Sequence, residues 1–256
     1  MPAEVSLGMP LLYAFLLVLA RVSGVCALVP LPGMQASPAL ARIVLSVVLT
    51  FALFPRWPQP QYVPASPARL LLWVLPEAAV GVVIGLAVSF LLEAFVLAAQ
   101  IISLNAGFSF ASTIDPATQA ESGVLVVFAQ LASGLVFLSL GLDRQVVRTL
   151  AQSLDTYPAG AWLTPRAADG MIRLSADMLS LALRLALPAV ALLVLTDVAL
   201  GLLGRLNAQL QLLTLSFPIK MMGTLILLGW IMALLPKLLG AYGARAFSTL
   251  GQVLRF

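Results

Sequence analysis

The chain has 256 residues, of which 61% are hydrophobic and only 9% are charged, and its formal net charge is +4. Soluble domains carry about 25% charged residues, so this composition excludes an ordinary soluble protein and predicts an integral membrane protein. Because unpaired backbone groups cannot face lipid, we expect the chain to be mostly helical. The 14 Lys and Arg residues are scattered without a basic block, which argues against nucleic acid as a partner.

Apolar segments that approach or exceed the ~20 residues of a membrane-spanning helix follow one another along the chain. We predict six helices, over residues 7–29, 39–54, 69–104, 124–142, 173–203 and 210–239. The fourth should continue as an amphipathic piece to Leu154, and Pro218 should interrupt the sixth. Residues 155–170 are expected to form a connecting loop, and the tail around Leu250 has the spacing of a short surface helix.

The predicted fold class is therefore an all-α polytopic membrane protein with about six kinked and interrupted helices. We expect a single membrane domain over residues 1–256. Residues 1–154 supply the first four helices, and residues 171–256 supply a C-terminal helical hairpin and tail. The distribution of Lys and Arg places both termini in the cytoplasm, provided that the helices alternate across the bilayer.

Small residues recur every four positions in the third predicted helix, at Gly81, Gly85 and Ser89. This spacing gives one helix face without bulky side chains, so another helix can approach its backbone closely. We expect these three residues to form a close helix contact, either within this chain or against a neighbouring subunit.

Ionisable residues lie within or near the apolar segments. They are Arg21, Glu77, Glu93, Arg184, Asp197 and Lys220. A charge at membrane depth costs at least ~2.5 kcal/mol, so these groups should face protein or water. Pairing between helices is the structural interpretation and a solute or proton pathway is the functional one; the pattern favours pairing because the acids are not clustered. We single out Glu93, Arg184, Asp197 and Lys220 as candidate buried charges. The sequence leaves open whether Lys220 pairs with Asp197 or with a partner subunit.

A polar stretch between two long apolar runs, "SLNAGFSFASTIDPATQAESG" (residues 103–123), interrupts this pattern. It contains Phe108 and Phe110 but no Lys or Arg, which is typical of a segment on the non-cytoplasmic side of the membrane. Small residues allow tight backbone turns, two phenylalanines supply bulk that excludes water, and Gly107 is a plausible flexible point. An ordinary connecting loop is the alternative interpretation.

Sequence motifs for catalysis are missing. We find no Gly-rich phosphate loop, no paired metal ligands and no nucleophile with a nearby base. His is absent from the chain, and the single cysteine, Cys26, has the surroundings of a small core residue. We therefore expect a protein that is not an enzyme, with no catalytic residue, no metal site and no cofactor.

Two stretches resemble the flagellar biosynthetic protein FliR family. Residues 107–150, beginning "GFSFASTIDPATQAESG", are similar to the middle of that family, where small and aromatic residues and an Asp-Pro precede a helix. Residues 199–228, with "RLNAQLQLLTLSFPIK", resemble its later signature, a "PQLN" element followed by a Phe-Pro step. Ala208 and Gln211 depart from that signature. The injectisome export-apparatus subunit T has a similar architecture and remains the related alternative.

The resemblance implies a non-enzymatic subunit of the type III export gate, in the bacterial inner membrane at the flagellar basal body. The implied partners are the flagellar P and Q proteins, the switch protein B, unfolded export substrates in transit, and membrane lipid. It also implies that the subunit lines a narrow pore and that one segment plugs the closed pore. The residues that match this plug are Gly107, Phe108, Ser109, Phe110, Ala111, Ser112, Thr113, Ile114, Asp115 and Pro116.

Other function classes are compatible with an apolar helical chain. A secondary transporter of a small solute should show two halves with matching broken helices. We see no convincing similarity between the halves, and the "SFPIK" element (residues 216–220) has no counterpart in the first half. A structural scaffold would differ from an export-gate subunit only in whether the chain lines the pore.

Overall fold

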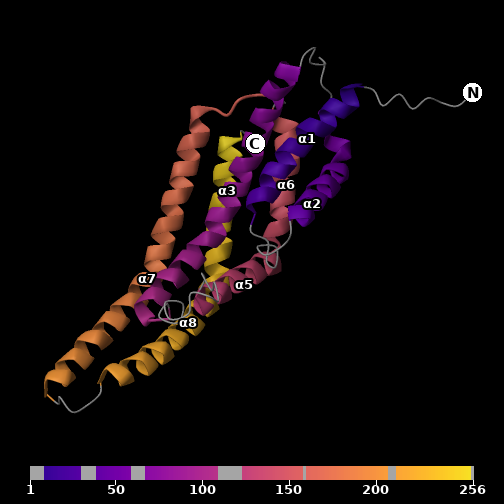
Figure 1. Cartoon of the computed structure of the whole chain (residues 1–256). Helices are drawn as coiled ribbons and strands as arrows, with labels where there is room; N and C mark the ends of the chain where they lie inside the picture. The colour runs from indigo at the N-terminus through magenta and orange to yellow at the C-terminus, as the bar shows by residue number, and fades with distance from the viewer. Residues whose placement is uncertain are drawn as a thin grey trace, which may run out of the picture. The chain divides into compact units, whose positions relative to one another are not determined.

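The structure is a computed structural model of the chain, and it describes residues 9–29, 39–58, 67–108, 123–157, 160–206 and 212–254. Within these ranges the chain is helical apart from short turns and contains no strand (Figure 1). In chain order the elements are α1 (Met9–Leu28), α2 (Ala39–Ala52), the 3₁₀ helix η1 (Phe54–Arg56), α3 (Pro67–Ala106), α5 (Val124–Ser139), α6 (Leu142–Thr156), α7 (Pro165–Leu206) and α8 (Leu212–Val253). The predicted all-α polytopic fold is confirmed.

Four of the described helices, α1, α3, α7 and α8, are long and apolar enough to cross a membrane. The α5–α6 pair makes a fifth if the bent pair is counted as one span. Helix α2 has 14 residues and is therefore about 21 Å long, which is short of the ~30 Å hydrocarbon core. The six apolar segments expected from sequence are present, but α2 lacks spanning length. The alternation of helices across the bilayer stays a prediction.

Helices α7 and α8 are longer than the sequence indicated. Helix α7 begins at Pro165, inside the expected loop, because proline suits the first helical position and the Ala167 N–H donates to the Thr164 carbonyl at 2.8 Å. Helix α8 runs unbroken through Pro218 and continues to Val253. The predicted interruption at residues 216–220 and the separate surface helix in the tail are therefore wrong. Proline is tolerated in membrane helices when its surroundings satisfy the freed backbone groups.

The fourth predicted helix is two helices, α5 and α6, which meet at a bend of 67°. Gly141 lies at the bend with a φ of 67°, in the left-handed region that glycine adopts without strain. No atom lies within 4 Å of the position that a Cβ on Gly141 would occupy. A glycine is therefore favoured here by the backbone conformation and not by crowding. The expected amphipathic continuation beyond residue 142 is present as α6.

The chain divides into two compact units, and α3, α7 and α8 each contribute one segment to both. The first unit comprises Met1–Phe90, Gly141–Ser175 and Gly243–Phe256. Its buried side chains come from parts of the sequence that are far apart, including Leu17, Ile84, Leu150 and Leu250, each at most 1% exposed. The aromatic side chains Phe15, Phe51 and Trp57 also contact one another here, with ring centroids 5.5 to 6.3 Å apart.

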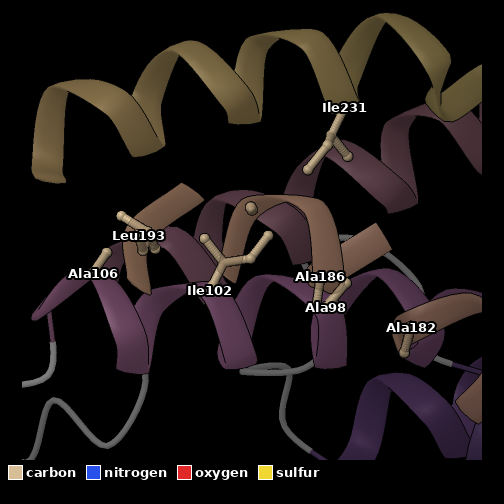
Figure 2. Close-up of a cluster of buried hydrophobic side chains, with 8 residues drawn as sticks. Ala98, Ile102, Ala106, Ala182, Ala186, Leu193 and Ile231 are labelled. Atoms are coloured by element: carbon tan, nitrogen blue, oxygen red, sulfur yellow. The ribbon is translucent and has the colours of Figure 1, made fainter. Parts of the chain in front are cut away.

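The second unit comprises Leu91–Leu140 and Ala176–Tyr242. Figure 2 shows its buried cluster, in which small side chains of α3 and α7 face each other and Ile231 of α8 joins them. The cluster consists of Ala98, Ile102, Ala106, Ala182, Ala186, Ala189, Leu193 and Ile231. Because five of these eight residues are alanines, α3 and α7 can pack closely along this stretch.

Candidate functional site

The small-residue face of α3 lies against α1. A Cβ on Gly81 would be 2.0 Å from the carbonyl oxygen of Arg21, so only glycine fits at this position. One turn later, a Cβ on Gly85 would be 3.0 Å from the Leu28 Cβ, and the Ser89 hydroxyl donates to the Leu28 carbonyl at 2.5 Å. Gly24 of α1 meets the same face, and a Cβ there would be 2.7 Å from the Ala78 carbonyl oxygen. The structure therefore places Gly81, Gly85 and Ser89 together in one close helix contact within this chain.

A buried ion pair lies beside this contact. The Arg21 Nε donates to Oε2 of Glu77 at 2.7 Å, and the two side chains are 1% and 3% exposed. The Arg21 Nη1 donates to the Ser153 carbonyl at 2.5 Å and to the Ser153 hydroxyl at 3.1 Å. The pair thus connects α1 and α3 to the last turns of α6, where the carbonyls of a helix attract a cation.

The turn after α6 completes this network. The Gly160 N–H donates to Oε1 of Glu77 at 2.8 Å, so both carboxylate oxygens of Glu77 accept hydrogen bonds. Gly160 has a φ of 76°, and its Cβ position is 3.3 Å from the Trp73 ring. Tyr157 is buried, and its hydroxyl donates to the Trp162 carbonyl at 2.8 Å.

The polar stretch that interrupts the apolar pattern begins and ends beside Ser103. Gly107 has a φ of 87°, and the Phe108 N–H donates to the Ser103 carbonyl at 3.1 Å, which is a glycine cap at the end of α3. Gly123, which starts α5, has its Cβ position 3.0 Å from the Ser103 hydroxyl oxygen. The chain therefore leaves α3 and enters α5 at the same place.

Only two residues of the predicted plug can be placed. Gly107 is buried in the cap, and the Phe108 side chain packs against the buried cluster that Figure 2 shows. A hydrophobic residue directly after the capping glycine commonly makes such a contact. The other plug residues, Ser109, Phe110, Ala111, Ser112, Thr113, Ile114, Asp115 and Pro116, lie outside the described residues.

Two of the predicted buried charges pair with each other. The Lys220 Nζ on α8 lies 2.5 Å from Oδ1 of Asp197 on α7, and the side chains are 15% and 52% exposed. This answers the question that the sequence left open, because the partner of Lys220 lies in the same chain. Asp197 is accessible in the single chain, so the pair sits at the edge of the helical hairpin rather than in its core.

The remaining two candidate charges differ from the expectation of burial. Glu93 on α3 is half-buried, and Arg184 on α7 is exposed in the single chain. No ion pair of the described residues involves either of them. Pairing between helices thus holds for Arg21 with Glu77 and for Lys220 with Asp197. Glu93 and Arg184 stay candidates for contacts outside this chain.

The fold defines an integral membrane protein of packed helices with internal ion pairs, and among the described residues no group of His, Cys, Asp or Glu is arranged to hold a metal. The sequence model of the family described as bacterial export proteins, family 1, matches residues 12–244. The chain therefore belongs to the FliR family of bacterial export proteins.

Relatives from distant bacteria match most of the chain. It is 27% identical over 243 residues to the flagellar biosynthetic protein FliR of Escherichia coli strain K12, covering 92% of this chain and 90% of the relative. It is 29% identical over 220 residues to FliR of Bacillus subtilis strain 168, with 84% of each chain covered. The FliR of Caulobacter vibrioides is 25% identical, covering 81% of this chain and 84% of the relative.

Proposed function

We propose that this chain is a non-enzymatic subunit of the flagellar type III export gate in the bacterial inner membrane. The observation that carries the proposal is the family match over residues 12–244, together with FliR relatives that align over most of their own length. The four long apolar helices agree with a membrane location. The proposed site in the cell is the flagellar basal body.

The proposed role is to line the pore through which unfolded flagellar proteins pass, and to close it with Gly107–Pro116. Two described features support a closure at this point. Phe108 and Gly123, on either side of residues 109–122, both lie beside Ser103, so the contact between the end of α3 and the start of α5 does not depend on those residues. Phe108 packs against the buried cluster of the second unit, and this contact would anchor one end of the proposed closing segment.

The proposed partners are the flagellar P and Q proteins and the switch protein B. The exposed surface of the α7–α8 hairpin supports an assembly, because large apolar side chains such as Leu195, Ile226 and Trp230 are 60% to 72% exposed in the single chain. Lipid or neighbouring subunits must cover such a surface. Arg184 lies on the same hairpin, and an exposed arginine in an apolar helix favours contact with protein over lipid.

Complementation and co-purification test this proposal. In a strain that lacks its own FliR, expression of the full-length chain should restore secretion of flagellar proteins into the medium. The tagged chain should also co-purify with P- and Q-like subunits in a fixed ratio. Restoration of injectisome secretion instead would point to the related subunit T. A monodisperse monomer that transports a small solute would overturn the proposal.

A further inference from the structure

A groove lies between α1 and α2, which run side by side in opposite directions (Figure 1). Ala27 meets Arg42 at one end of the pair, and Phe15 meets Phe51 at the other. The groove has a volume of about 580 Å³, which is within the ~300–1,000 Å³ of small-molecule sites. The described residues that line it all belong to α1 and α2, and both helices are part of the first unit.

Arg42 is the charged residue among the described residues that line this groove. Its Nη1 donates to the Ala27 carbonyl at 3.3 Å, which uses one of the five N–H donors of a guanidinium. No carboxylate in the described parts of the chain pairs with Arg42. The side chain is half-buried, so water alone does not surround it. A half-buried guanidinium with free donors is suited to an anion that can accept two hydrogen bonds at once.

The polarity of the groove changes along its length. Ala27 is in the last turn of α1, a helix long and apolar enough to cross a membrane, so Arg42 lies beside one end of that helix. Leu19 lies about 12 Å from Ala27 along α1, and Val47 lies about 7.5 Å from Arg42 along α2, so both line the part of the groove away from that helix end. The hydroxyls of Ser23 and Ser46 already donate to backbone carbonyls of their own helices. The inner part of the groove therefore presents mainly apolar atoms.

We propose that this groove binds one anionic membrane phospholipid, with its phosphate at Arg42 and an acyl chain along Leu19, Ile43 and Val47. Basic pockets between membrane helices hold acidic lipid head groups in this way. Free phosphate would leave the apolar walls exposed, and a neutral lipid would leave the guanidinium without an anion. The proposal does not depend on the export function, because it rests on α1 and α2 alone.

Lipid retention by the full-length chain tests this site. The chain is purified from nanodiscs of phosphatidylglycerol and phosphatidylcholine, and native mass spectrometry counts the lipid that remains bound. One phosphatidylglycerol should be retained, and Arg42→Gln should lower its retention about tenfold, as expected for the loss of a charge-assisted contact. Arg205→Gln is the matched control, because Arg205 is also an arginine near the end of an apolar helix and is exposed. It should retain lipid like the unchanged chain.

Two further probes separate the sources of the ligand. Diacylglycerol with the same acyl chains, or inorganic phosphate without lipid, should not be retained. Binding of either one as tight as that of phosphatidylglycerol would overturn the proposal, as would equal retention by Arg42→Gln. If Arg42→Gln does not fold, a photo-crosslinking amino acid at the exposed Ile43 decides the question within the assembled complex. Attachment to lipid supports the site, and attachment to another protein chain overturns it.

Discussion

Arg21 and Glu77 form a fully enclosed ion pair, with 2.7 Å between Nε and Oε2 and with 1% and 3% of their side chains exposed. The two residues lie 56 positions apart, on α1 and α3. The pair also holds Ser153 of α6 and the backbone of Gly160, so four segments of the first unit depend on it. It is the structural centre of that unit, next to the point where Gly81 meets the Arg21 carbonyl.

Removal of one partner of this pair should be strongly destabilising. Arg21→Met leaves the Glu77 carboxylate buried without its cation, and loss of one member of a buried pair costs about 3–5 kcal/mol. The double variant Arg21→Met with Glu77→Gln should recover part of the loss, because it leaves no buried charge. Thermal unfolding of the purified chain in detergent measures both effects. Arg56→Gln is the control, since the Arg56–Asp155 pair is 47% exposed on each side and should contribute less than about 1 kcal/mol.

Substitution of the small-residue face should show a gradient along α3. Gly81→Ala should lower yield and thermal stability sharply, because its methyl group would fall 2.0 Å from a backbone oxygen. Gly85→Ala should be milder, because the new methyl group would lie 3.0 Å from a side-chain carbon, the Leu28 Cβ. Gly85→Leu should prevent the close approach of α1 and weaken assembly. Gly201→Ala is the control, because nothing lies within 4 Å of that position. Equal stability of all four variants would contradict the close contact.

The Lys220–Asp197 pair should matter less than the enclosed pair. Lys220 is 15% exposed but Asp197 is 52% exposed, so solvent or a neighbouring subunit can satisfy the carboxylate after the lysine is removed. Lys220→Met should therefore reduce stability by roughly 1 kcal/mol, between the values for surface and buried pairs. Lys220→Arg should do less harm. A double-mutant cycle with Asp197→Asn measures the coupling, and a coupling of zero would show that the pair has no energetic role.

Shortening the polar stretch after α3 should open the proposed gate without unfolding the subunit. Because Phe108 and Gly123 both lie near Ser103, deletion of residues 109–114 leaves the two anchored ends in place. Cells with this deletion should leak ions or small solutes that the intact complex excludes, as membrane conductance or dye uptake can measure. Phe108→Ala is the matched variant, and it should lower stability by loss of packing against the cluster. If the deletion complex assembles and leaks no more ions or small solutes than the wild type, the plug proposal is wrong.

Much of the fold follows from the sequence because hydrophobic runs and glycine spacing are local signals. Membrane helices, the small-residue face at Gly81 and the amphipathic character of α6 could all be read directly. The continuity of α8 could not be predicted, because a proline at position 218 predicts a helix break. Only the tertiary surroundings show that the helix tolerates it. The burial of Tyr157 could not be predicted for the same reason, since it depends on the distant parts of the chain that cover it.

The candidate site was predicted only in part. Pairing between helices was the favoured interpretation of the apolar-segment charges, yet no local pattern shows that Arg21 takes Glu77 while Lys220 takes Asp197. These choices depend on which helices become neighbours in space. The cap at Gly107 did carry a readable signal, a glycine followed by phenylalanine at the end of an apolar helix. That Gly107 is a flexible point of the closure stays a prediction.

The first unit draws on both ends of the sequence, and this has a consequence for synthesis on the ribosome. Gly170 packs on Val253, and the side chains of Leu250 and Leu254 are completely buried. The core that contains Leu17 is therefore unfinished until the last turns of α8 have been translated, roughly 230 residues after Leu17, or about 12–47 s later at 5–20 residues per second. During that interval α1, α2 and the first half of α3 must be kept from wrong partners by lipid or by insertion factors. A nascent chain halted before residue 243 would carry α1, α3, α7 and most of α8 and still lack a completed first unit.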